Sequence, residues 1–289
     1  MPTFRHNAAL VLYSLVLGVL FCIAPQPVGA QEQGYTSAKQ AYRLGMQAHR
    51  AGNSARAVPA LTFAAGEGVL GAQLKLAEML ETGNGVEQNK ATAFQYYQQI
   101  ADVYAETNPR HPVAGHIAGV FIKLAEHHAR GIEALKLESD LAKAAGFYRH
   151  AASYFGDPRA QYQLAKLHLA GEGVEQNPKL AINWLANASR KRHAPSQALL
   201  GDLLWRGTKK IRRQPVKGLA LLALAQRNAR GSDAAWIGDI YKRAREEADP
   251  KDLAKARDLG RDWARSQSGN FVAPTAMPTV DTADTALGP

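Results

Sequence analysis

Apolar residues recur at helical spacing along most of the chain. Around residue 164 they fall on one helix face at Ala160, Leu164 and Leu167, three or four positions apart. A second face follows in the same way, formed by Ala181, Trp184, Leu185 and Ala188. No segment alternates apolar and polar residues over the length of a strand. The pattern therefore predicts an all-α protein with almost no sheet.

The segment between these two faces carries signals for the end of one helix and the start of another. Gly171-Glu-Gly173 ends the first helix, because glycine tolerates the positive φ of a helix C-terminus. Asn177-Pro178 then supplies an N-cap, followed by a proline suited to the first helical turn. The same start signal occurs at Asp157-Pro158 and Asp249-Pro250. Each unit is therefore predicted to be two helices joined by a short turn.

This helix pair is repeated along the chain. The pentapeptide Gly-Val-Glu-Gln-Asn occurs at residues 85–89 and again at 173–177, and another glycine stands two positions before each copy. Less regular copies lie around residues 44–52, 124–131 and 200–207. Stacked helix pairs form a solenoid, so we predict an α/α solenoid of about 12 helices over residues 31–265. Four glycines are expected to be structural residues of the repeat turns: Gly83, Gly85, Gly171 and Gly173.

The C-terminal end of this region departs from the repeat. Two helices, at about residues 232–248 and 250–265, are expected to form a helical cap anchored by Trp236 and Trp263. Residues 266–289 lack Lys and Arg and are rich in Thr and Ala, a composition that predicts a disordered tail.

Residues 1–30 have the organisation of a secretory signal peptide. Arg5 precedes an apolar run over residues 8–23, and small residues at Val28 and Ala30 allow cleavage before residue 31. A retained membrane anchor is the alternative, but a membrane-spanning helix needs about 20 apolar residues and this run is shorter. We therefore expect a periplasmic protein that is not an integral membrane protein after cleavage.

Cleavage also removes the chain's one cysteine, Cys22. A lipid anchor at Cys22 is disfavoured because the large Phe21 stands where a lipid-attachment motif needs a small residue. Without a thiol the mature chain can form no disulfide, thiolate zinc site or cysteine nucleophile. Packing alone must then stabilise the fold.

The charge of the chain is strongly basic and unevenly distributed. The formal net charge is +10, and almost all of the positive excess lies after residue 150. Export excludes nucleic acid as an ordinary partner, so the basic clusters either keep the chain soluble or face an acidic partner domain or an anionic membrane. The clusters fall in consecutive units and are expected on one edge of the solenoid. The candidate partner-binding residues are Arg190, Lys191, Arg192, Lys209, Lys210, Arg212 and Arg213.

No sequence pattern indicates catalysis, a metal or a cofactor. The Gly-x-Gly turns lack the third glycine and the Gly-Lys-Ser/Thr of phosphate loops, and nucleophile elbows and His-Glu-x-x-His helices are absent. His127 and His128 fall on different helix faces and cannot chelate one metal together. We therefore expect a protein that is not an enzyme and binds no cofactor.

Two histidines occupy a position that is apolar in other units. His128 and His168 align with Leu80 and Leu204, which places both histidines in the helix-packed interior. They are either ordinary neutral core histidines or candidates for a pH switch, because burial disfavours the charged imidazole.

The pattern Leu-Ala-x-Leu…Gly-x-Gly-Val…Asn…Ala…Trp-Leu, seen at residues 164–185, resembles the Sel-one-like repeat, a relative of the tetratricopeptide repeat. The resemblance covers roughly residues 37–230 and implies a scaffold that binds proteins.

A narrower resemblance is to the ExoR family of exported repeat proteins that repress exopolysaccharide synthesis. It is carried by five segments: His150–Asp157, Tyr162–Ala165, Asn183–Ala186, Gln197–Asp202 and Gly218–Leu222. It implies binding to the periplasmic domain of a membrane sensor histidine kinase, which is held inactive, and degradation by a periplasmic protease as a second interaction. A structural scaffold in cell-envelope or polysaccharide assembly is the alternative function.

Overall fold

The computed structural model describes residues 34–266, which contain twelve α-helices and one 3-10 helix. Two isolated backbone bridges, Ile132 with Leu137 and Thr208 with Ile211, are the only extended pairings in this part of the chain. The elements are α1 (Ala38–Arg50), α2 (Ser54–Gly66), α3 (Leu70–Thr82), α4 (Lys90–Tyr104), α5 (Ala114–Arg130), η1 (Glu133–Leu135), α6 (Leu141–Ser153), α7 (Pro158–Ala170), α8 (Pro178–Arg190), α9 (Ala194–Arg206), α10 (Pro215–Asn228), α11 (Asp233–Glu247) and α12 (Pro250–Ser266).

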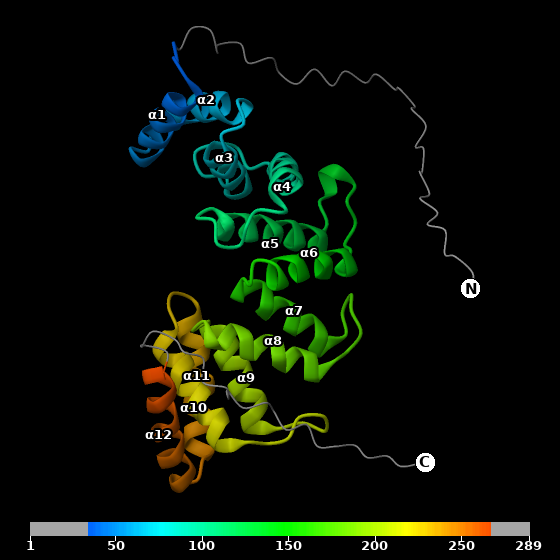
Figure 1. The fold of residues 1–289 in the computed structure, drawn as a ribbon, viewed down its shortest axis with the longest axis vertical. Coiled ribbons are helices and arrows are strands. Elements are labelled where there is room, and N and C mark those ends of the chain that lie inside the picture. Colours follow the sequence, from blue (N-terminus) through cyan, green and yellow to red (C-terminus); the bar gives the residue numbers. More distant parts are fainter. Residues whose placement is uncertain (1–33, 267–289) are drawn as a thin grey trace, which may run out of the picture.

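Successive helices pair and the pairs stack along one axis (Figure 1). We number the pairs unit 1 (α1 and α2) to unit 5 (α9 and α10). Helices α11 and α12 both pack on α10 at the end of the stack, as the cap predicted from the sequence. The all-α solenoid predicted from the repeats is confirmed.

Small residues set the distance between the stacked helices. In α8, for example, Ala181 and Ala188 are fully buried, and the adjoining space is filled by the buried side chain of Leu185. A buried alanine lets a neighbouring backbone approach, while a buried leucine contributes about 1.5–3 kcal/mol through removal from water. The core therefore runs along the whole axis as a series of apolar clusters between neighbouring helices.

The predicted helix starts are present. The side chain of Asn177 accepts a hydrogen bond from the backbone N–H of Leu180 at 2.9 Å, and Asp157 accepts from Arg159 and Ala160. Asp249 accepts from the N–H of Lys251 at 2.7 Å in the same way. These bonds satisfy N–H groups that have no partner within the helix.

Both tryptophans of the predicted cap are half-buried. Trp236 packs among the apolar residues around α10 and donates from Nε1 to Asp233 at 3.0 Å. Trp263 of α12 contacts the same core and the apolar cluster that units 4 and 5 share. The proposed signal peptide at residues 1–30 and the proposed tail after Ser266 lie outside the described residues.

Candidate protein-interaction surface

The repeat turns of units 2 and 4 depend on two glycines with different tasks. The first, Gly83 or Gly171, follows the helix with φ of 72° or 77°, in the left-handed region. The second, Gly85 or Gly173, also has a positive φ, of 77° or 67°. A Cβ on Gly173 would overlap the backbone of Leu141, and one on Gly85 would overlap the hydroxyl of Ser54. The second glycine is therefore where the turn touches the preceding unit.

A pair of hydrogen bonds closes units 2 to 5 in the same way. The backbone N–H at the start of the second helix donates to a carbonyl near the end of the first. The four donor–acceptor pairs are Asn89 to Leu80, Asp140 to His128, Asn177 to His168 and Gln214 to Leu204, at 2.7–2.9 Å. The residue before each donor adds a side-chain bond to the next carbonyl: Gln88 to Glu81, Ser139 to Ala129, Gln176 to Leu169 and Arg213 to Trp205.

This closure gives Arg213, a candidate partner-binding residue, a structural role that the sequence did not reveal. Its Nε donates to the Trp205 carbonyl at 2.9 Å, and its guanidinium lies 5.0 Å from the centre of a Trp205 ring. The signal in the sequence for this structural role is that Arg213 aligns with Gln88 and Gln176, which make the same bond in units 2 and 4. It was hidden because the donors differ chemically.

The other members of the 209–213 cluster are exposed. Lys209, Lys210 and Arg212 surround the buried Ile211, which anchors the loop to the core. The Lys210 ammonium donates to the side chain of Gln176 in the preceding turn at 3.3 Å. The loop therefore lies beside the glycine turn of unit 4, with Arg212 directed to solvent.

The second basic cluster, residues 190–192, lies at the opposite end of α9, so the expectation of a single basic edge is wrong. Helix α9 has 13 residues and so separates the two clusters by about 20 Å. Lys191 donates to the carbonyl of Gly156, and burial lowers the pKa of its ammonium. Arg190 is exposed beside Asn187, and Arg192 has a positive φ of 61°.

The two candidate histidines are both buried but have different surroundings. His128 is 3% exposed, stacks on Phe147 with ring centres 5.3 Å apart, and meets the edge of Phe94. Burial, with Lys143 and His127, lowers the pKa of His128, against a smaller opposing effect of Asp140. His168 instead makes a hydrogen bond from Nδ1 to the carbonyl of Glu175 at 3.1 Å.

A buried pair between units 2 and 3 was not found from the sequence. The Nε2 of His127 lies 2.9 Å from a carboxylate oxygen of Glu81, and both side chains are largely buried. The hydrogen bond with His127 lowers the pKa of Glu81, although burial opposes this. The sequence places His127 and His128 on different faces of one helix, but it does not show that Glu81 of α3 contacts His127 of α5.

The odd-numbered helices, joined by Tyr97 of α4, line a groove of about 510 Å³ that crosses from α3 to α11. We call it the odd-helix groove. It carries both signs of charge on a partly apolar floor. Its lining includes Glu78, Tyr97, Val120, Ile122, Lys123, Glu126, Arg159, Tyr162, His193 and Asp233.

Side chains in the middle of the odd-helix groove are held by local contacts. Tyr162 lies against His193, with ring centres 5.5 Å apart, and Arg159 binds Asp157 through two nitrogens at 2.8 and 3.2 Å. Burial raises the pKa of Tyr162 and lowers that of His193, which favours the neutral forms of both. A fixed surface of mixed polarity is suited to docking a protein, in which aromatic and arginine side chains contribute most.

Within residues 34–266, no group of three or more potential metal-ligating residues lies close enough together to hold an ion. No helix in the same range is long and apolar enough to span a membrane.

The fold and its glycine turns define the class of protein. The Sel1 repeat family matches residues 71–102, 158–193 and 194–225. The crystal structure of a Sel1 repeat protein from Oxalobacter formigenes is similar over 78% of this chain and 88% of that one, with a TM-score of 0.57 and 21% identity. The chain is a Sel1-repeat protein, a class that mediates protein–protein interaction.

Two curated relatives define the family more closely. An exopolysaccharide production negative regulator of Rhizobium leguminosarum bv. viciae is 32% identical over 77% of this chain and 81% of its own length. One of the same description from Rhizobium meliloti (strain 1021) is 32% identical over 70% of this chain and 73% of its own length. The chain belongs to this family, and the resemblance inferred from its motifs is confirmed.

Proposed function

We propose that this protein is a non-enzymatic negative regulator of exopolysaccharide production that acts in the periplasm. It binds the periplasmic domain of a membrane sensor histidine kinase and holds the kinase inactive. The observation that carries the proposal is the 32% identity to two such negative regulators over most of the chain. The signal-peptide pattern of residues 1–30 supports export, and a Sel1-repeat solenoid supports action by binding.

The odd-helix groove is the proposed docking surface for the kinase domain. It runs across several units, as an extended solenoid surface does when it holds a folded partner. Its mixed charges fix the orientation of a partner, and its aromatic residues supply contact area.

The role is tested in a strain that lacks the gene, by measuring exopolysaccharide and kinase-dependent transcription. Raised output of both, restored by the wild-type gene, is expected for a repressor. Lost exopolysaccharide with unchanged kinase-dependent transcription contradicts the proposal and indicates an assembly scaffold.

The surface is tested by charge reversal in the groove. Lys123→Glu changes a half-buried groove residue on α5 whose ion pair among the described residues is with Glu126. We expect at least tenfold weaker binding to the purified kinase domain and raised exopolysaccharide. Lys179→Glu makes the same change at an exposed position of α8, outside the groove, and the variant is expected to behave as wild type. Equal binding by both variants contradicts docking in the odd-helix groove.

A further inference from the structure

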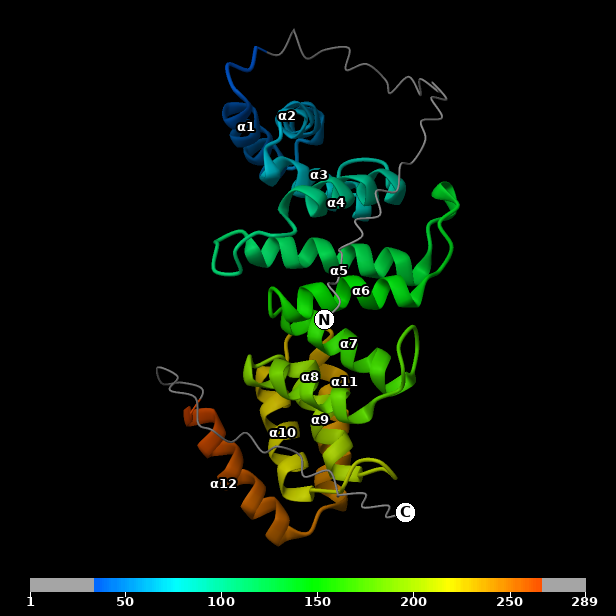
Figure 2. The same ribbon diagram turned by 45° about the vertical axis from the view of Figure 1, so that its right-hand side comes forward.

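A second groove lies in the C-terminal cap, away from the odd-helix groove. Helices α11 and α12 both pack on α10, but α12 diverges from α11 (Figure 2), and a groove remains between these two helices over α10. The resulting groove has a volume of about 460 Å³. We call it the cap groove. Its floor is apolar and comes from three helices: Leu219, Ala223 and Leu224 of α10, Leu253 and Ala256 of α12, and Tyr241 of α11.

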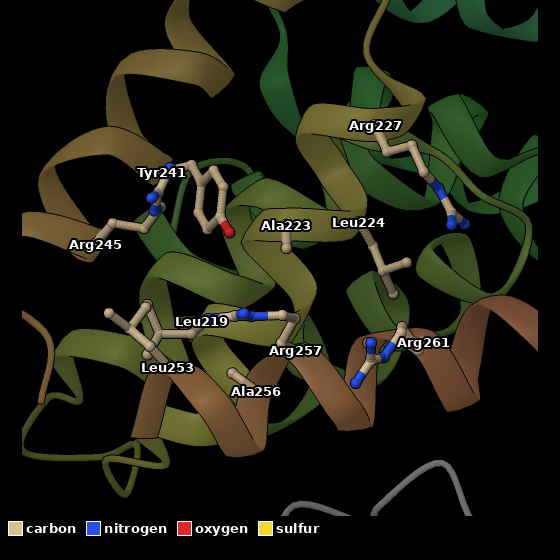
Figure 3. Close-up of a pocket in the computed structure, with 11 residues that line it drawn as sticks. Leu219, Ala223, Leu224, Arg227, Tyr241, Arg245, Leu253, Ala256, Arg257 and Arg261 are labelled. Carbon is tan, nitrogen blue, oxygen red and sulfur yellow. The ribbon is translucent and has the colours of Figure 1, made fainter. Parts of the chain in front are cut away.

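Four arginines surround this floor, and no acidic residue lines the cap groove (Figure 3). Arg227 comes from α10, Arg245 from α11, and Arg257 and Arg261 from α12. Their positive charges converge from three helices, which sequence spacing alone could not show.

The four guanidinium groups are weakly engaged within the described residues. Arg245 lies 5.6 Å from the ring centre of Tyr241, and Arg261 pairs with the exposed Asp258. Exposed pairs of this kind contribute only about 0–1 kcal/mol and exchange readily for a better acceptor. Within residues 34–266 the side chains of Arg227 and Arg257 make no ion pair, so both guanidinium groups can bind an anion.

We infer that the cap groove binds an acidic amphipathic peptide segment of a protein partner. Apolar side chains of that segment cover the half-buried Ala223, Tyr241 and Leu253, and its carboxylates pair with the arginine rim. A guanidinium presents a planar fork that binds a carboxylate through two hydrogen bonds, and helix-in-groove recognition uses this combination of apolar floor and polar rim.

The floor and rim together select this chemistry. An acidic polysaccharide would satisfy the arginines but would leave the half-buried Ala223, Tyr241 and Leu253 without apolar contacts, and an apolar helix would leave the arginines unpaired. The inference concerns a second surface and does not depend on the proposed regulatory role.

The test uses the full chain and a fluorescent helical peptide in which Leu and Glu alternate at helical spacing. Fluorescence anisotropy is expected to show binding that weakens with added salt, because the charges are exposed. A peptide with Gln in place of every Glu, or with Ser in place of every Leu, is expected to bind at least tenfold more weakly. Equal binding by either control peptide overturns the inference.

Variants locate the site. Arg227→Gln with Arg257→Gln is expected to weaken binding of the Leu-Glu peptide at least tenfold. Arg243→Gln with Lys255→Gln removes the same charge from exposed positions of α11 and α12 outside the groove, and is expected to change binding less than twofold. Equal loss in both pairs shows general attraction to a basic protein and overturns the inference.

A steric variant separates shape from charge. Ala223→Phe fills the floor at a half-buried position and leaves every arginine in place, so binding should fall at least tenfold with unchanged melting temperature. If the variant melts earlier, the two arginine pairs decide the outcome. Other occupants are measured in parallel, and each of three results overturns the inference. The first is displacement of the peptide by phosphatidylglycerol vesicles, and the second is a dimer that dissociates when Arg227→Gln and Arg257→Gln are combined. The third is tighter peptide binding after Asp281→Asn with Asp284→Asn, which indicates that the chain's own C-terminal segment occupies the groove.

Discussion

Units 2 and 4 close their helix pairs with the same pentapeptide, whereas units 3 and 5 use unrelated segments. Unit 3 inserts η1, and unit 5 inserts the basic loop around the buried Ile211. All four nevertheless make the same backbone bond and the same side-chain bond to the following carbonyl. The repeat therefore preserves hydrogen bonds to two carbonyls at the end of the first helix and the start of the second helix, while the residues that donate these bonds change.

The largest expected effect breaks a regular turn. Gly173→Val places a β-branched residue at a φ of 67° and forces it into the backbone of Leu141, so unfolding free energy should fall by about 3 kcal/mol or more. Urea unfolding measures this. Gly146→Val, at an exposed position of α6 with open space around it, is the control and should change stability by less than about 0.5 kcal/mol. Equal stability of the two variants would show that the turn does not need its second glycine.

The next effect tests whether the irregular turn of unit 5 works as the regular ones do. Arg213→Ala removes the donor to the Trp205 carbonyl and should cost about 1 kcal/mol. Arg213→Gln supplies the amide used by Gln88 and Gln176 and should recover most of this loss. Thermal and urea unfolding compare the two. If Gln is no better than Ala, the donors of the four turns are not equivalent.

A smaller effect is the pH dependence that the buried His128 gives to stability. The pKa of His128 is lower in the folded protein than the value of about 6.5 expected after unfolding, so the unfolded state binds a proton first as the pH falls. This contribution to stability is complete above about pH 6.5 and declines below it, towards the folded pKa. Groups that face the ring are His127, Lys143 and Asp140.

The melting temperature, measured between pH 7.5 and 5, tests this pH dependence of stability. His128→Leu, as in the units with leucine at this position, should reduce the loss of stability on acidification. His168→Leu is the matched control for replacing a buried imidazole by leucine, and it loses the bond to Glu175 at every pH. Parallel curves for wild type and His128→Leu would remove His128 as a pH-sensitive group.

The smallest expected effect on stability comes from Arg212, beside the structural Arg213. Arg212→Glu changes an exposed side chain and should alter unfolding free energy by less than about 0.5 kcal/mol. If the 209–213 loop contacts an acidic partner, the variant should bind the kinase domain more weakly, most clearly at low salt. Unchanged pull-down at low ionic strength would assign Arg212 to solubility alone.

The odd-helix groove could be predicted only in outline. That repeats present a binding surface follows from the sequence, but Glu78, Lys123 and Arg159 belong to three different units and share no spacing signal. Their convergence depends on how each unit is rotated on the last. The two basic clusters show the same limit: they are close in sequence, yet α9 carries them to opposite edges.

The sequence by itself determined the helices, their caps, the repeat and the family, because these depend on local φ preferences and on apolar periodicity within each helix. Asn177 caps a helix and Gly171 ends one whatever lies around them. The tertiary structure alone decided that Gly173 touches Leu141, that Glu81 meets His127, and that four arginines surround one groove over α10. These contacts join different helices, and their distances depend on packing between helices rather than on any pattern along the chain.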